Sequence, residues 1–369
     1  MTVPFGDFLL KGNHTFFNFL SEAENSTFKT EYFIYSMLRK ILRFALILIT
    51  LLVLVYVLGP EVDTPTLDRS LPEVTADLAQ LDQEIQQHEA SIPNIKPDNE
   101  ARIVWADSVR QKTPYSIVYL HGWSASQEEG DPIHLETAKL YGCNLYLPRL
   151  YGHGLIEADT MSGITSDKLL YSAKKAIAVG KQLGDKVILM ATSTGGTLGL
   201  YLAGGDPDIA GLLLYSPNIA IFDPNARFLA KPWGLQLAKL ANGGDYHEFD
   251  NITEENSKYW TTKYPVAALT HLQALVEETM TKETFASVQQ PVFLGYYYKD
   301  RIHQDSTVSV PAMLRMYNQL GTPRNLKRKV AFPNVGAHVM TSHITSKDLE
   351  SVQQETNRFL EGILGLEPR

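Results

Sequence analysis

The chain is short of cysteine and of positive charge. Its 369 residues include a single cysteine, Cys143, so no disulfide can form within the chain, and we expect this thiol to be a buried spectator. The formal net charge is -8, and without a basic stripe a nucleic-acid partner has little support. The sequence also lacks the residue clusters that hold zinc and the glycine fingerprint that binds a nucleotide, so no metal and no cofactor are expected.

One long apolar run stands near the N-terminus. Residues 41–58 are almost purely apolar, and about eighteen helical residues at 1.5 Å each just cross a bilayer core. Basic residues precede the run and acidic residues follow it: Arg39, Lys40 and Arg43 before or at its start, Glu61 and Asp63 after it. The positive-inside rule then predicts a single-pass anchor over residues 37–58, with the rest of the chain extracytoplasmic, either periplasmic or at the cell surface. A cleaved signal peptide, followed by secretion, is the alternative.

The segments on either side of this run carry weaker patterns. Residues 1–36 are mixed in character, whereas Met37 begins a stretch typical of a membrane-targeted chain, so we hypothesise that Met37 is the natural start. Residues 59–100 are expected to form a stalk, because several prolines there resist regular structure. Apolar residues then recur every three or four positions, at 71, 74, 78, 81 and 85, which predicts one short amphipathic helix.

Ser193 lies where a strand-like apolar run breaks into small residues. Residues 187–191 are typical of a buried strand, and the glycines at 195 and 196 begin a helix-like segment. A nucleophile on such a sharp turn projects from the backbone, provided that its neighbours two residues away are small. The pattern predicts a nucleophile elbow with Ser193 as the nucleophile, although Ala191 replaces its usual first glycine. The alternative is a turn whose residues are small for backbone reasons alone.

Two later strand-like runs end in groups that would activate this serine. Residues 291–300 end in Asp300, and residues 329–338 end in a loop that presents His338. A serine hydroxyl needs an imidazole to take its proton, and the imidazole needs a carboxylate to fix its tautomer. We predict His338 as the base and Asp300 as the acid, because Asp300 terminates its strand directly. Asp305 is the alternative acid if the loop is longer.

An oxyanion hole is predicted upstream of the serine. Residues 116–123 form a β-rich run that ends in His121, Gly122 and Trp123. The turn after this strand would bring the amide of Trp123 beside the serine, where it and the amide of Thr194 would bind an oxyanion. His121 is expected to brace this loop rather than to act as a base.

Serine, acid and histidine in this order is the chain order of α/β hydrolases. The chain resembles that superfamily over residues 101–366, and within it the bacterial carboxylesterase and monoacylglycerol-lipase-like branch, also called serine aminopeptidase-like hydrolases. The resemblance rests on the Ser193 elbow and on four short motifs: His121-Gly122, Leu150-Tyr151-Gly152-His153-Gly154, Lys299-Asp300-Arg301-Ile302 and Gly336-Ala337-His338-Val339-Met340. The departures are Ala191 and the extra Ala337 between Gly336 and His338.

The alternation of strand-like and helix-like runs agrees with an α/β fold. It includes a strand over 103–106 and helices over 166–183 and 265–280, and it predicts a mostly parallel sheet flanked by helices over residues 101–369. The superfamily inserts a helical cap where this chain has an aromatic-rich stretch at about 217–290, which would form an apolar acyl pocket.

The resemblance implies a serine hydrolase that cleaves carboxylic esters through an acyl-enzyme. Short or medium acyl esters and monoacylglycerol-like lipids are the expected substrates. Three alternatives stay open: a small-peptide aminopeptidase or amidase with the same triad, an acyltransferase with that triad, and a non-catalytic binding protein on this fold. The sequence leaves the oligomeric state open.

Overall fold

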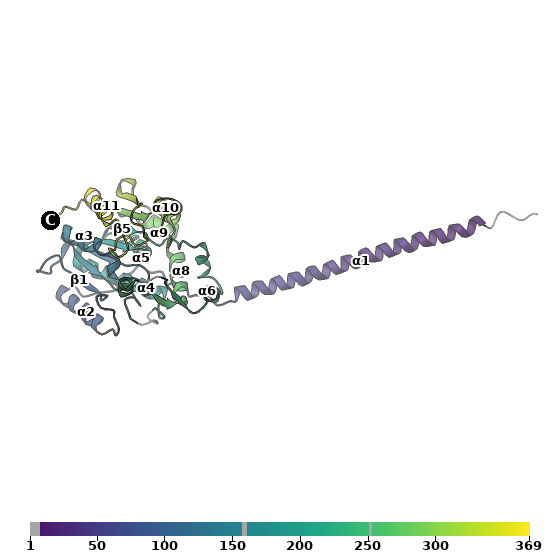
Figure 1. The fold of residues 1–369 in the computed structure, drawn as a ribbon, viewed down its shortest axis with the longest axis horizontal. Coiled ribbons are helices and arrows are strands. Elements are labelled where there is room, and N and C mark those ends of the chain that lie inside the picture. The colour runs from purple at the N-terminus through teal and green to yellow at the C-terminus, as the bar shows by residue number, and fades with distance from the viewer. Residues whose placement is uncertain (1–7, 157–160, 251–252) are drawn as a thin grey trace, which may run out of the picture. The chain divides into compact units, whose positions relative to one another are not determined.

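The computed structural model describes residues 8–156, 161–250 and 253–369, in two units that divide after Gly59 (Figure 1). The first unit contains one helix, α1 (Phe8–Val57). Its part Phe28–Val57 is apolar enough to cross a membrane and is not buried by other parts of the protein, unlike the core helix of a globular domain. The predicted anchor lies within α1, and a helix of this length and composition near an N-terminus fits a membrane anchor or a signal sequence.

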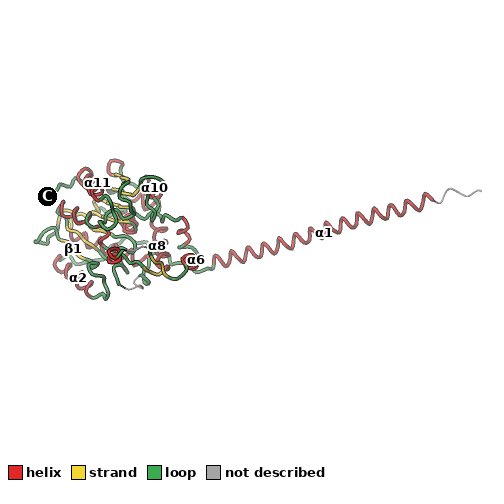
Figure 2. The backbone as a smooth tube through the Cα atoms, viewed as in Figure 1, coloured by secondary structure: helices red, strands yellow, loops and turns green. Residues whose placement is uncertain are grey.

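The second unit, Pro60–Arg369, is built on a seven-stranded sheet with the order β1-β3-β2-β4-β5-β8-β9. Figure 2 shows the strands of this unit in yellow among red helices. β1 runs antiparallel to β3, and every other neighbouring pair is parallel. The bounds are β1 (Arg102–Val104), β2 (Thr113–Leu120), β3 (Asn144–Leu147), β4 (Gly184–Thr192), β5 (Ile209–Tyr215), β8 (Val292–Tyr297) and β9 (Lys327–Phe332). This is the predicted mostly parallel sheet, although β1 begins and ends earlier than the expected 103–106.

Helices cover both faces of the sheet, because its central strands are apolar on both faces. In β4, Leu189 and Ala191 belong to one apolar cluster, and Ile188 and Met190 belong to the other. The helices α4 (Ser166–Leu183), α5 (Thr194–Ala203) and α10 (Val310–Gln319) pack against the first face. The helices α3 (Ile133–Tyr141) and α11 (Leu349–Gly362) pack against the second. The helix predicted at 166–183 is confirmed as α4.

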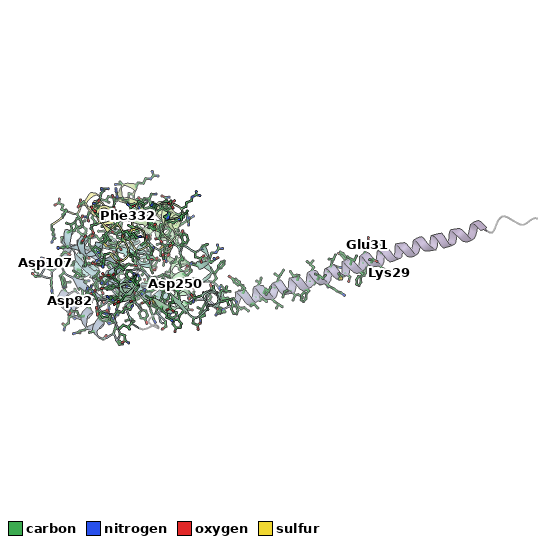
Figure 3. The ribbon with its side chains drawn as sticks, in the orientation of Figure 1. Lys29, Glu31, Asp82, Asp107, Asp250 and Phe332 are labelled. Atoms are coloured by element: carbon green, nitrogen blue, oxygen red, sulfur yellow. The ribbon has the colours of Figure 1, made fainter. Side chains whose placement is uncertain are left out.

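The segment expected to be a stalk packs against the sheet unit instead of standing apart. Its helix is α2 (Leu78–Ala90), which begins after Asp77, whose carboxylate accepts the amide of Gln80 as an N-cap. The apolar residues at 71 and 74 pack on the core without being helical, so the predicted helix begins later than expected. Asp82 of α2, labelled in Figure 3, accepts a hydrogen bond from Trp105 Nε1 at 3.3 Å. Glu89 forms a buried ion pair with Arg149 at 2.7 Å.

Between β5 and β8 the chain leaves the sheet and forms the insertion predicted at 217–290, which we call the cap. Its elements are a short 3-10 helix η2 (Pro224–Phe228), α6 (Gly234–Asn242), β6 (Tyr246–Glu248), α7 (Glu254–Tyr259), β7 (Lys263–Pro265), α8 (Val266–Thr279) and α9 (Lys282–Ser287). β6 and β7 form a small antiparallel sheet. Helix α8 agrees with the predicted 265–280. The amide of Thr261 donates to Ser124 O at 2.7 Å, which ties the cap to the loop after β2.

Candidate active site

Ser193 sits on a strained turn between β4 and α5. Its backbone has φ 52° and ψ -119°, a left-handed conformation that non-glycine residues rarely adopt and that costs about 1–3 kcal/mol. The turn is held because Ser193 N donates to Tyr215 O at 3.1 Å and Asn218 N donates to Ser193 O at 2.9 Å. A Cβ on Gly195 would lie 1.9 Å from Leu120 O, so this position must be glycine. The backbone is therefore that of the predicted elbow.

His338 is held by a carboxylate, and the carboxylate belongs to Asp305. The distance from His338 Nδ1 to Asp305 Oδ2 is 2.7 Å. The other oxygen, Oδ1, accepts the amides of Thr307 and Val308 at 2.9 and 3.0 Å. Asp305 is fully buried, and a carboxylate can only accept here, so Nδ1 carries the proton. In neutral His338 this leaves Nε2 as a proton acceptor.

The prediction of Asp300 as the partner of His338 is corrected by this geometry. Asp300 follows β8, but its side chain is half exposed and its carboxylate accepts from His303 Nδ1 at 2.9 Å. The chain makes a short excursion at residues 298–304, closed by a bridge between Tyr298 and Gln304. Asp305 N then donates to Tyr297 O at 3.1 Å, which returns Asp305 to the end of the strand. The alternative acid is therefore the one that reaches the histidine.

Charge and burial set the pKa values of this pair. Burial favours the neutral form of Asp305, but the positive charge and hydrogen bond of His338, together with two backbone amides, hold the pKa of Asp305 below its usual value. Burial likewise favours neutral His338, but the charge and hydrogen bond of Asp305 and the charge of Glu129 raise the pKa of His338 above its usual value. The imidazole is therefore a stronger base than a free histidine.

The loop after β2 is braced by His121, as expected. Leu150 N donates to His121 Nε2 at 3.1 Å, so Nε2 is an acceptor and the proton lies on Nδ1, which is 3.0 Å from Gly122 O. Burial lowers the pKa of His121 to about 3, so the ring stays neutral. His153 packs edge-on against the rings of His121 and Trp123. These rings orient the backbone at Trp123.

A single cavity of about 1040 Å³ brings the predicted site residues together. Ser193, Thr194, Trp123 and His338 all line it, while Asp300 does not. His338 Nε2 is buried and has no hydrogen-bond partner among the described residues, so no hydrogen bond joins it to Ser193 Oγ, although both residues line the cavity. In free enzymes such bonds are often long and tighten only around a bound substrate. Most of the remaining lining is apolar and comes from the cap, including Leu237, Trp260 and Leu269.

One buried carboxyl group in this cavity, that of Glu129, was not predicted from the sequence. It is 2% exposed and lies on the 3-10 helix η1 (Gln127–Gly130) that follows the oxyanion loop. Its Oε2 accepts the amide of Gly122 at 2.6 Å. Burial raises the pKa of Glu129 to about 7, although the Gly122 amide and the His338 charge oppose this rise. The acidic run at residues 128–131 was the available signal, but it carries no periodicity that would place it in the site.

Near η1, the described part of the chain has one group that could hold a cation. Glu128, Asp131 and His343 bring ligand atoms within 4.8 Å of one another. The His343 side chain is 44% exposed, and the three residues do not line the cavity that holds Ser193. His343 Nδ1 lies 3.4 Å from Asp131 Oδ2 and 3.7 Å from Glu128 Oε1, so the three residues form an ion-pair cluster.

A parallel sheet with a strained serine after a central strand, a histidine after the last strand and a cap over both defines a hydrolase-type α/β fold. The model of the alpha/beta hydrolase family matches residues 117–345, and the chain belongs to this family.

Known proteins with similar sequences or folds agree with membership of the alpha/beta hydrolase family. The chain is 30% identical over 171 residues to a thermostable monoacylglycerol lipase of Bacillus sp. (strain H-257), an alignment that covers 46% of this chain and 64% of that protein. Its fold is similar to that of a metagenome-derived lipolytic enzyme of the LipS and LipT pair, with TM-score 0.58 and 18% identity over 73% of this chain and 100% of the other. It is also similar to a soluble variant of the Saccharomyces cerevisiae monoglyceride lipase, with TM-score 0.54 and 12% identity over 71% of this chain and 91% of the other. The alignment with the monoacylglycerol lipase covers less than two thirds of that protein, and the two structural similarities show a shared fold.

Proposed function

We propose that this protein is a serine hydrolase that cleaves carboxylic esters through an acyl-enzyme, with Ser193 as nucleophile, His338 as base and Asp305 as the acid. One observation carries the proposal. A strained elbow serine lines the same cavity as a histidine, and the Nδ1 of that histidine is held by a fully buried carboxylate. Such an arrangement has a structural cost to the fold, and its chemical use is proton removal from the serine.

The reaction follows from the positions of these groups. Ser193 Oγ attacks the ester carbonyl carbon while its proton passes to His338 Nε2, and Asp305 stabilises the imidazolium that forms. The carbonyl oxygen becomes an oxyanion that accepts the amides of Trp123 and Thr194, neither of which donates to another described residue. The C–O bond then breaks, and His338 returns the proton to the leaving alcohol. Water repeats the sequence on the acyl-enzyme and releases the carboxylic acid.

The size and apolar lining of the cavity support an apolar acyl group as the part of the substrate that binds there. Its volume of about 1040 Å³ and its apolar cap wall fit short or medium acyl esters and monoacylglycerol-like lipids. The similarity to a bacterial monoacylglycerol lipase agrees with this choice. We also infer that α1 anchors the enzyme, with residues from Pro60 onward on the extracytoplasmic side. Protease added to cells whose outer envelope is permeabilised and whose cytoplasmic membrane is intact should then degrade the hydrolase unit, whereas protection until the cytoplasmic membrane is lysed contradicts this orientation.

The test is labelling with a fluorophosphonate, which reacts only with an activated serine. Ser193→Ala should abolish labelling and reduce hydrolysis of a p-nitrophenyl ester by about 10⁴-fold or more. Ser216→Ala is the matched control, because Ser216 is a buried serine after the neighbouring strand β5 and does not line the cavity. Retained labelling in Ser193→Ala would refute the assignment. Labelling without turnover of any ester, but with turnover of amides or acyl transfer to alcohols, would instead favour the amidase or acyltransferase.

A further inference from the structure

Glu129 is a buried carboxyl group in the cavity that the proposed reaction does not use. One of its oxygens, Oε2, accepts from the Gly122 amide at 2.6 Å and lies 3.2 Å from the hydroxyl of Tyr119. The other, Oε1, has no hydrogen bond among the described residues, and a Cβ on Gly122 would lie 2.6 Å from it and 3.0 Å from Ser193 Cβ. The carboxyl group therefore lies against the backbone that separates it from the nucleophile.

Glu129 also joins the loops that carry the other site residues. Its backbone oxygen accepts from Thr341 Oγ1 at 2.7 Å, three residues after His338. The Tyr119 hydroxyl lies 3.0 Å from Thr192 Oγ1, immediately before Ser193. The three hydroxyl protons can then each have an acceptor. Thr341 donates to the Glu129 backbone oxygen, Thr192 can donate to the Tyr119 hydroxyl, and Tyr119 can donate to the Glu129 carboxylate. The oxyanion loop and the elbow are thus connected through the side chain of Glu129, and the histidine loop through its backbone oxygen.

We propose that Glu129 is a positioning residue for ester hydrolysis: it holds the oxyanion loop through the Gly122 amide, and its negative charge stabilises protonated His338. This inference rests on the proposed function. The Gly122 amide precedes the Trp123 amide by one residue, so fixing the first sets the direction of the second. A carboxylate that is buried in the protein, as that of Glu129 is, acts on a nearby imidazole more strongly than one at the surface does.

Among the described residues, few titratable groups act on the pKa values of Glu129 and His338. Glu129 and His338 line the same cavity, and the charge of each acts on the pKa of the other; Tyr119 lies against Glu129, and Asp305 against His338. Burial brings the pKa of Glu129 to about 7, and the pKa of His338 is raised above its usual value, in part by the charge of Glu129. Because the two groups interact, their ionisations are coupled, and the acid limb of the rate profile reports both.

Two substitutions separate the hydrogen bond from the charge. Glu129→Gln keeps an oxygen that can accept the Gly122 amide but removes the charge. The acid limb of kcat/KM should move to lower pH by about half a unit to one unit and become a single ionisation, with kcat on the plateau changed by less than about tenfold. Glu129→Ala removes both, and kcat should fall by about 10²-fold with little change in KM, because an oxyanion donor is misplaced. Rescue of kcat by glutamine relative to alanine distinguishes positioning from bulk packing.

Glu128→Gln is the matched control, since Glu128 is the preceding buried glutamate of η1 and does not line the cavity. Its acid limb should stay at the wild-type position. If Glu129→Ala does not fold, the glutamine variant and the imidazole titration of His338 by NMR carry the test. An unmoved or raised acid limb in a labelled, active Glu129→Gln enzyme overturns the role of Glu129. Failure of the wild-type protein to react with a fluorophosphonate overturns the proposed function instead.

Discussion

The base of the cavity and its cap hold their side chains in different ways. At the base, Asp305, Glu129 and His121 are almost or fully buried, and each has at least two hydrogen bonds to the protein. In the cap, Leu237 and Leu240 of α6 are 55% and 80% exposed. Directed hydrogen bonds fix atoms to within fractions of an ångström, whereas apolar contact contributes in proportion to area. Substitutions at the base should therefore change the chemistry, and substitutions in the cap should change only substrate preference.

The largest difference in kcat is expected between variants of the two aspartates that follow β8. Asp305→Asn should lower kcat by about 10³-fold or more, because an amide can donate to Nδ1 and favour the wrong tautomer of His338. Asp300→Asn should leave kcat within about twofold, since its carboxylate binds only the exposed His303 loop. Steady-state kinetics on a soluble ester, with thermal unfolding to check the fold, measures both. A large loss in Asp300→Asn with a small one in Asp305→Asn would reverse the assignment.

A second difference between base and cap should appear as acid sensitivity. Burial lowers the pKa of His121 and His134 to about 3 and that of His153 to about 4. These groups stay neutral in the folded protein but bind a proton when it unfolds below pH 6.5. Stability from each is therefore complete above pH 6.5 and is lost as the pH falls toward the folded value. At pH 5 the loss is about 2 kcal/mol for each histidine.

His134→Gln tests this acid effect at a buried histidine that does not line the cavity. The free energy of unfolding in urea should fall less between pH 7 and pH 5 in the variant than in the wild-type protein, by about 2 kcal/mol. His247 of the cap is half-buried, with a pKa that burial lowers less far, so His247→Gln should change the pH dependence less. Equal pH dependence in His134→Gln and the wild-type protein would show that the ring is not buried as a neutral base.

The smallest effect is expected in the cap wall. Leu237 lines the cavity, and Leu237→Ala should reduce kcat/KM for an octanoyl ester about three- to tenfold relative to an acetyl ester, because the longer acyl chain loses apolar contact. The control is Leu240→Ala, on the same helix but not part of the cavity lining. The two ratios are measured by competition between the two esters. A uniform loss on both esters in Leu237→Ala would mean that the cap acts on the chemistry rather than on selectivity.

The parts of the molecule that local patterns determine were predictable from the sequence. The α4 helix was predicted from its apolar spacing, and the Ser193 elbow from its small neighbours, because each depends on residues within a few positions. The pairing of His338 with Asp305 was not predicted as the first choice, since it depends on how residues 298–304 fold back on themselves. Glu129 was missed for a similar reason: Gly122 lies seven residues before it in the connection between β2 and α3, and only the fold of that connection through η1 brings the two together.

The backbone conformation of Ser193 has a consequence for the stability of the protein. A glycine at this position would adopt φ 52° with less strain, so the protein would be more stable without the side chain that we assign to catalysis. The serine is tolerated because the surrounding sheet is large and well packed enough to impose an unfavourable conformation on one residue. Variants that weaken this core elsewhere should therefore lose the geometry of the turn before they lose the fold.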